Sequence, residues 1–109
     1  MKATDIPDSS RRAVRDRDPA CRLCGRSGVV LELHHIVYRS QARNWHGPEN
    51  LIALCGPSVG FAGCHRIAHT HPKVVRPALQ HVLERPRLTG LAWLRQQGVD
   101  ISALTRGTL

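Results

Sequence analysis

The sequence predicts a small α+β domain in which two short strands are followed by helices and held together by bound metal. Three observations lead to this prediction. The chain has 109 residues and four cysteines, its first half contains apolar segments between turn residues, and its second half has helical spacing of apolar residues. A chain of this length buries limited apolar surface, so a metal ion that joins separate segments would supplement its core.

The composition favours a nucleic-acid partner. Sixteen Lys and Arg residues against eight acidic residues give a formal net charge of +8. A phosphate backbone is the natural counterpart of so much positive charge on a short chain. No apolar run reaches the about eighteen residues of a membrane span, and residues 1–20 lack the apolar middle of a secretory signal. We therefore expect a cytoplasmic protein, bacterial or from a phage-infected host cell, with reduced thiols and no membrane partner.

Residues 1–18 are expected to form a charged N-terminal arm. They mix both charge signs densely, with almost no apolar periodicity, and prolines stand at positions 7 and 19. The segment is either a loose solvated tail or a short helix capped by Ser9 or Ser10. The functional interpretation is an arm that follows DNA phosphates, and the simpler one, which we favour slightly, is the solvated tail.

A hairpin is predicted in the first half of the chain. Residues 29–36 are rich in β-branched and apolar side chains and follow a Ser-Gly pair, so they indicate a strand. Alternation places Glu32 and His34 on one face of this strand, and Leu33 and His35 on the other. Residues 38–49 lack periodicity and form a loop, and residues 51–54 form the second strand. A Gly/Pro-rich insert, residues 56–63, then leads into a helix that begins near positions 64 or 65.

The chain beyond Pro72 is predicted to be a helical extension, residues 73–109, of a core that spans residues 19–72. Pro77 is expected to break or restart the first helix of the extension, and a last helix runs from about Thr89 to Gly98. The apolar residues at three- and four-residue steps are Val74, Val75, Ala78, Leu79, Val82 and Leu83.

The cysteines predict a structural zinc site. Cys21 and Cys24 have the two-residue gap of a zinc knuckle, and Gly25 can take the positive φ that such a turn often needs. Cys55 and Cys64 are separated by eight residues, a long gap that the glycines of the insert allow to fold back. The alternatives are unrelated buried thiols, disulfides, or a redox pair in the first knuckle, although the strand-to-helix setting of a redox motif is missing.

The histidines predict a second, catalytic metal site. His65 and His69 are four positions apart and share a helical face, which suits an ion that prefers imidazole. His34 from the strand would be a third ligand and leave positions open for water and a phosphate oxygen. His35, on the opposite face, suits a general base. Asn50 is expected either to hold that base in orientation or to close the loop before the second strand.

Several further residues near these sites have less specific interpretations. Candidates for phosphate contacts are Arg39, Arg43 and Arg66, of which Arg66 is the first choice because it adjoins a ligand. The remaining histidines are expected to be a loop residue at His46, beside Trp45, and surface or capping residues at His71 and His81.

From Cys21 to His69 the chain contains, in order, Cys-x-x-Cys, His-His-Ile, Asn-Leu, Leu-Cys and Cys-His-x-x-x-His. This order resembles that of the HNH endonucleases. The resemblance implies a small zinc-stapled ββα-metal (His-Me finger) fold with flanking helices, in which a hairpin and a helix clasp one divalent ion. That ion would be Mg²⁺, Mn²⁺, Ni²⁺ or Zn²⁺. The long insert looks like the form in many phage HNH proteins, which would suggest a DNA-packaging partner such as terminase. By resemblance, His34 would be a metal ligand and His35 the general base. Asn50 and His65 would be the middle and final residues of the HNH motif, and His69 would complete the set of metal ligands.

The sequence thus predicts a metal-dependent HNH endonuclease that hydrolyses DNA phosphodiester bonds, by nicking or cutting the duplex. One alternative is a catalytically inactive, zinc-stabilised DNA-binding module, and a third is a redox protein that uses its first cysteine pair. A pure binding module has no need of a general base beside a metal site, which favours the nuclease.

Overall fold

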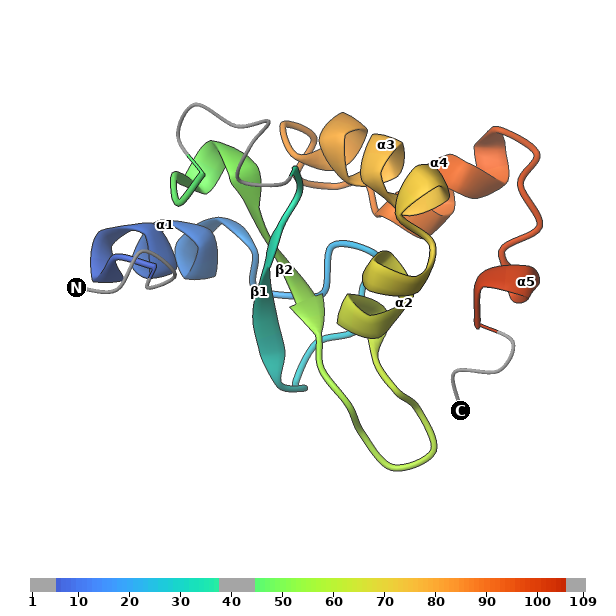
Figure 1. The fold of residues 1–109 in the computed structure, drawn as a ribbon, viewed down its shortest axis with the longest axis horizontal. Helices are drawn as coiled ribbons and strands as arrows, with labels where there is room; N and C mark the ends of the chain where they lie inside the picture. The colour runs from blue at the N-terminus through green and yellow to red at the C-terminus, as the bar shows by residue number, and fades with distance from the viewer. Residues whose placement is uncertain (1–5, 38–44, 106–109) are drawn as a thin grey trace.

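A two-stranded antiparallel hairpin separates one helix on one side from a group of helices on the other (Figure 1). The computed structural model of the chain describes residues 6–37 and 45–105. Among the described helices, none combines the length and the apolar character needed to span a bilayer. The elements in chain order are α1 (Asp8–Arg17), β1 (Leu31–His35), the 3-10 helix η2 (Pro48–Asn50), β2 (Leu51–Cys55), α2 (Cys64–Thr70), α3 (Pro72–Val82), α4 (Gly90–Gln96) and α5 (Ser102–Thr105).

The hairpin has the alternation that the sequence predicts. Its register pairs Leu31 with Cys55 and His35 with Leu51. All five residues of β2 are buried, because helices cover both faces of this strand, whereas β1 is mostly half-buried. The small α+β architecture and the hairpin-plus-helix arrangement of the predicted fold class are therefore confirmed.

Helix α1 occupies the segment for which both a tail and a helix were considered, and the solvated-tail interpretation does not hold for residues 8–17. The helix follows Pro7, which provides no side-chain cap, so the expected serine cap is not formed. Val14 is fully buried against Leu51 and Ala53 of β2, which makes a small second core on this face of the hairpin. Burial of this apolar side chain therefore helps to hold a helix whose other residues are largely charged.

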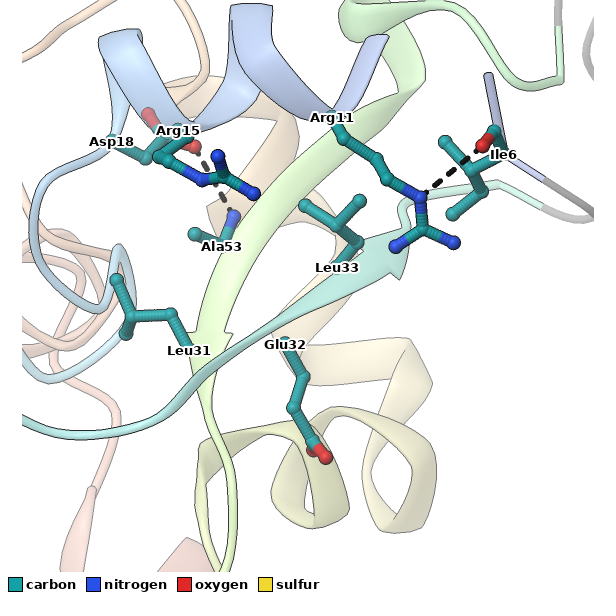
Figure 2. Close-up of a pocket in the computed structure, with 8 residues that line it drawn as sticks. All are labelled: Ile6, Arg11, Arg15, Asp18, Leu31, Glu32, Leu33 and Ala53. Atoms are coloured by element: carbon teal, nitrogen blue, oxygen red, sulfur yellow. Dashed lines mark hydrogen bonds between the residues drawn. The ribbon is translucent and has the colours of Figure 1, made fainter. Parts of the chain in front are cut away.

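A hollow of about 450 Å³ remains between α1 and β1, because α1 covers only part of this face (Figure 2). Its apolar lining includes Leu31, Leu33 and Ala53, and its charged lining includes Arg11 and Arg15 of α1. It lies on the opposite face of the hairpin from α2.

The main core lies between the hairpin and the helices α2, α3 and α4. Ile52 and Leu54 of β2 enter it from the sheet, and Ile67 of α2 enters it from the helix that lies across the hairpin. Helix α3 continues through Pro77, so the expected break is wrong. Pro77 is exposed, and the buried apolar face of α3, which includes Val75, keeps the helix intact although one backbone hydrogen bond is lost.

A buried carboxylate connects the two sides of the fold. The Asp18 side chain, which is 0% exposed, accepts hydrogen bonds from Arg17 and Arg22 and from the backbone N–H of Ala53 on β2. Arg22 also donates to the backbone carbonyls of Val82, at the end of α3, and Arg85. Burial opposes ionisation of Asp18, but the hydrogen bonds from the two guanidinium groups outweigh it and lower the pKa of the carboxyl.

Candidate metal centres and active site

The four cysteines form one compact cluster at the end of the hairpin. Their sulfur atoms all lie within 4.8 Å of one another, and the Sγ atoms of Cys24 and Cys55 are 3.9 Å apart. A tetrahedral zinc ion with Zn–S bonds of about 2.3 Å places its sulfur ligands about 3.8 Å from each other. Three of the four cysteines are buried and Cys24 is partly exposed. The cluster could therefore hold zinc, and it would tie the segment before β1 to the junction of β2 and α2.

Two glycines make this cluster possible. Gly25 has a φ of +84° and donates its backbone N–H to the carbonyl of Cys21 at 2.8 Å, which closes the first knuckle. Gly63 has a φ of +98°, and a Cβ there would lie 2.6 Å from the carbonyl carbon of Gly56. Only a residue without a side chain allows the two ends of the insert to approach so closely. The long gap between the second pair of cysteines is closed in this way.

The electrostatics of the cluster also fit a cation. Hydrogen bonds from Cys24 and Cys64 lower the pKa of the Cys21 thiol. The same hydrogen bonds, given to Cys21, raise the pKa of Cys24 to about 11 and raise that of Cys64. The cluster therefore favours the thiolate of Cys21 and opposes ionisation of Cys24 and Cys64, whereas a divalent cation among the cysteines would favour the thiolate form of all four.

Three histidines form a second cluster between β1 and α2. One ring nitrogen from each of His34, His65 and His69 lies within 4.8 Å of the others. The Nε2 atoms of His65 and His69 are 3.2 Å apart, and the ring of His34 lies 5.1 Å and 5.0 Å from theirs, centroid to centroid. Imidazole nitrogens bound to one ion at about 2.1 Å are separated by about 3.0–3.4 Å. The pair His65 and His69 already has this separation, so the cluster could hold a metal ion with His34 as a third ligand.

The environment of His34 keeps it in the form that a metal requires. Its Nδ1 atom is buried without a hydrogen-bond partner among the described residues. Burial, together with the neighbouring imidazoles of His65, His69 and His35, lowers the pKa of His34 to about 3. Because metal ligation needs neutral imidazole, this unsatisfied nitrogen fits a divalent cation.

Glu32 is a member of this site that the sequence reasoning did not assign. Its Oε1 atom lies 3.0 Å from Nδ1 of His65, a contact that leaves Nε2 of the same ring directed at His69. A carboxylate behind a ligating histidine fixes the ring and its tautomer. Strand alternation had already placed Glu32 on the same face as His34, so this signal was present in the sequence.

His35 points away from the three-histidine cluster into a different environment. Its ring stacks on Trp45, with centroids 4.3 Å apart and an interplanar angle of 19°. Its Nε2 atom lies 3.3 Å from Nδ1 of His46. Burial lowers the pKa of His35, and His46 and His65 add to this effect, so the ring is neutral near neutral pH. A neutral imidazole outside the metal set is what a general base requires.

Asn50 closes the loop before the second strand, which was one of its two expected roles. Its Oδ1 atom accepts from the N–H of Val37 at 2.9 Å, and its Nδ2 atom donates to the carbonyls of Val37 and Trp45 at 3.2 Å and 3.1 Å. The side chain is buried and joins the two ends of the segment 38–44. No described contact links Asn50 directly to His35.

The structure places only part of the expected phosphate-binding set. Arg66 is exposed on α2 and lines a surface depression of about 350 Å³ with His65 and His69. Arg39 and Arg43 lie outside the described residues. Arg76 of α3 contributes a positive charge that the sequence analysis missed, since it lines the same small cavity as His34 and His69. Nothing local in the sequence signals this, because the packing of α3 against α2 brings Arg76 there.

The comparisons with known proteins address the same segment. Residues 21–71 match the family model described as HNH endonuclease, and this segment contains every cysteine and every histidine of the two clusters. Neither the curated proteins nor the solved structures gave a match. The matched segment comprises the two knuckles, the hairpin and α2, so residues 21–71 of this chain are a domain of the HNH endonuclease family.

Proposed function

We propose that this protein is a metal-dependent endonuclease that hydrolyses phosphodiester bonds of DNA, by nicking or cutting the duplex. The observation that carries the proposal is the set of three imidazole nitrogens within 4.8 Å of one another, with a fourth imidazole, His35, held outside it. The formal net charge of +8 supports DNA as the substrate. The proposed nuclease core is residues 19–72, between the arm 1–18 and the helical extension 73–109.

The three clustered histidines, His34, His65 and His69, would hold one divalent cation, and the four cysteines would hold a structural zinc ion. When bound, the divalent cation supplies positive charge that polarises the scissile phosphate and stabilises the leaving oxygen. Glu32 keeps the ring of His65 oriented toward the cluster through the 3.0 Å contact at its Nδ1 atom.

His35 would act as the general base that takes a proton from the attacking water. Its lowered pKa leaves the ring nitrogen unprotonated at neutral pH, so it is ready to accept that proton. Asn50 would keep the loop around the base closed, and Arg66, beside His65 on α2, would contact a phosphate of the bound strand.

Cleavage of supercoiled plasmid tests the proposal. Zinc-loaded protein is incubated with plasmid and Mg²⁺, Mn²⁺, Ni²⁺ or Zn²⁺, and the fractions of nicked and linear plasmid are quantified by gel electrophoresis. We expect His35→Ala to lower the rate by about 10²–10⁴-fold, as loss of a general base does. His81→Ala, which removes an imidazole that stacks on Trp93 outside the clusters, should stay within about twofold of wild type.

Two results would contradict the proposal in different ways. Nicking that survives His35→Ala would remove this residue from the role of base. A folded wild-type protein that binds plasmid without cleaving it under any of the four ions would favour a zinc-stabilised DNA-binding module. A phage origin and a DNA-packaging partner such as terminase remain predictions, which rest on the resemblance of the 56–63 insert alone.

A further inference from the structure

Trp45 and His46 form a second layer of aromatic rings around His35. The Trp45 ring lies parallel to that of His35, and the His46 ring lies 5.4 Å from it, centroid to centroid, with an interplanar angle of 57°. Trp45 and His46 also contact each other, with centroids 4.4 Å apart. Both residues stand just before η2, and neither belongs to the two metal clusters.

The hydrogen bonds of Asn50 hold the backbone on both sides of His46. The Nδ2 atom of Asn50 donates to the carbonyl of Trp45, and the backbone N–H of Asn50 donates to the carbonyl of Gly47 at 2.9 Å. His46 is therefore held between two backbone groups that Asn50 fixes. A side chain on such a closed turn can hold a neighbouring ring in one orientation.

We propose that His46 is a positioning residue for the general base: its Nδ1 atom accepts a hydrogen bond from Nε2–H of His35, which leaves Nδ1 of His35 to take the proton from water. The inference rests on the proposed function. Trp45 restricts the tilt of the His35 ring through the parallel stack, and His46 restricts its rotation and its tautomer.

The direction of the hydrogen bond follows from what a base needs. A neutral imidazole carries one proton, and the 3.3 Å contact occupies Nε2 of His35. If His46 donated, Nε2 would be the accepting nitrogen and Nδ1 would carry the proton, so neither would be free for water. If His46 accepts, Nδ1 is unprotonated. After the transfer, the proton from water resides on Nδ1, and Nε2–H keeps its partner.

The tautomer can be measured without any activity assay. Long-range ¹H–¹⁵N correlation spectra of zinc-loaded, ¹⁵N-labelled protein distinguish which ring nitrogen carries the proton, and the His35 signals are assigned from their loss in His35→Gln. We expect a single Nε2–H tautomer in wild type. His46→Phe keeps an aromatic ring but removes the acceptor, so the two tautomers should mix, whereas His46→Asn retains an acceptor at a similar position.

Kinetics on supercoiled plasmid provide the second measurement. His46→Phe should lower kcat by about ten- to a hundredfold, the usual effect of losing an orienting partner, while KM for the plasmid stays within about twofold. His46→Asn should recover kcat to within about threefold of wild type, because its Oδ1 atom can accept the same hydrogen bond.

Four outcomes overturn the inference on its own. They are an Nδ1–H tautomer of His35 in wild type, an unchanged kcat in His46→Phe, a change confined to KM, and a failure of His46→Asn to restore kcat. A wild-type protein that nicks with none of the ions overturns the proposed function, and with it the catalytic role of His46.

Discussion

Replacing Asp18 with asparagine tests whether the buried carboxylate holds α1, the hairpin and the C-terminal helices together. The substitution keeps the size of the side chain and removes its charge. In the native structure the carboxylate accepts four hydrogen bonds, from Nε and Nη2 of Arg17 at 2.9 Å and 2.7 Å, from Nη1 of Arg22 at 2.9 Å, and from the N–H of Ala53 at 3.1 Å. Figure 2 shows the last of these, between the end of α1 and β2.

The magnitude depends on how far each guanidinium is from solvent. The side chain of Arg22 is 6% exposed and that of Arg17 is 26% exposed, so Arg22 would keep a buried positive charge without its counter-ion. Loss of one partner of a buried charge pair costs about 3–5 kcal/mol. Arg22 retains the carbonyls of Val82 and Arg85 as acceptors, so we expect a loss near the lower limit, about 3 kcal/mol. That is a large part of the stability of a small domain, about 5–15 kcal/mol.

Urea denaturation at a fixed zinc concentration measures the effect. With a slope of about 1–2 kcal/mol per M, the midpoint of Asp18→Asn should fall by about 1.5–3 M. Asp16→Asn is the matched control, because Asp16 is exposed on the same helix, and its stability should change by no more than about 0.5 kcal/mol. A loss below about 1 kcal/mol for Asp18→Asn would refute the reasoning.

The pH dependence of the free energy of unfolding tests the same prediction. The folded pKa of Asp18 is lower than its ordinary value of 3.8, so the unfolded chain binds the proton more readily than the native one. The stabilisation from this shift is fully present above the unfolded pKa and is lost as the pH falls through the folded pKa. The difference in free energy of unfolding between wild type and Asp18→Asn should therefore be constant from pH 7 to 5 and narrow below about pH 4.

Three further predictions concern the two metal clusters. Gly63→Ala should lower the free energy of unfolding, measured by thermal denaturation, by more than about 2 kcal/mol, because its Cβ would lie 2.6 Å from a backbone carbon across the insert. Gly60 has a φ of +75° and open space around it, so the control Gly60→Ala should lower it by about 1 kcal/mol. Equal losses would contradict the close approach at Gly63. Cys24→Ser should lower the zinc content and unfold the domain, because zinc-binding energy is folding energy here, and a variant that melts like wild type would show that the cysteine cluster is not a structural zinc site. Burial and the neighbouring imidazoles lower the pKa of His34 to about 3, and burial also lowers the pKa of His69, so protons compete weakly with a cation at these two ligands. Calorimetry at pH 6 in two buffers should therefore detect at most about 1.5 protons released per Ni²⁺, and release of the two or more protons expected of three ordinary imidazoles would contradict this reasoning.

Much of this protein is determined by local sequence patterns. Three local patterns predict the two clusters: the spacing of Cys21 and Cys24, the adjacent pair His34 and His35, and the four-residue step from His65 to His69. Period-two alternation predicts the hairpin, and three- and four-residue steps predict the helices, because both periods follow from backbone geometry alone. The α+β fold class therefore follows from the sequence, and the order of the cysteines, histidines and asparagine gives the resemblance to the HNH endonuclease family.

The tertiary structure decided the contacts between segments that are distant in the chain. The interaction of Glu32 with His65, the cavity that Arg76 shares with His34, and the hydrogen bond of Asp18 with Ala53 all join residues more than thirty positions apart. No local period records such pairs, because they depend on how the helices pack on the two faces of the hairpin. His46 was expected to be only a loop residue for the same reason: its contact with the His35 ring exists only once η2 and β1 lie side by side.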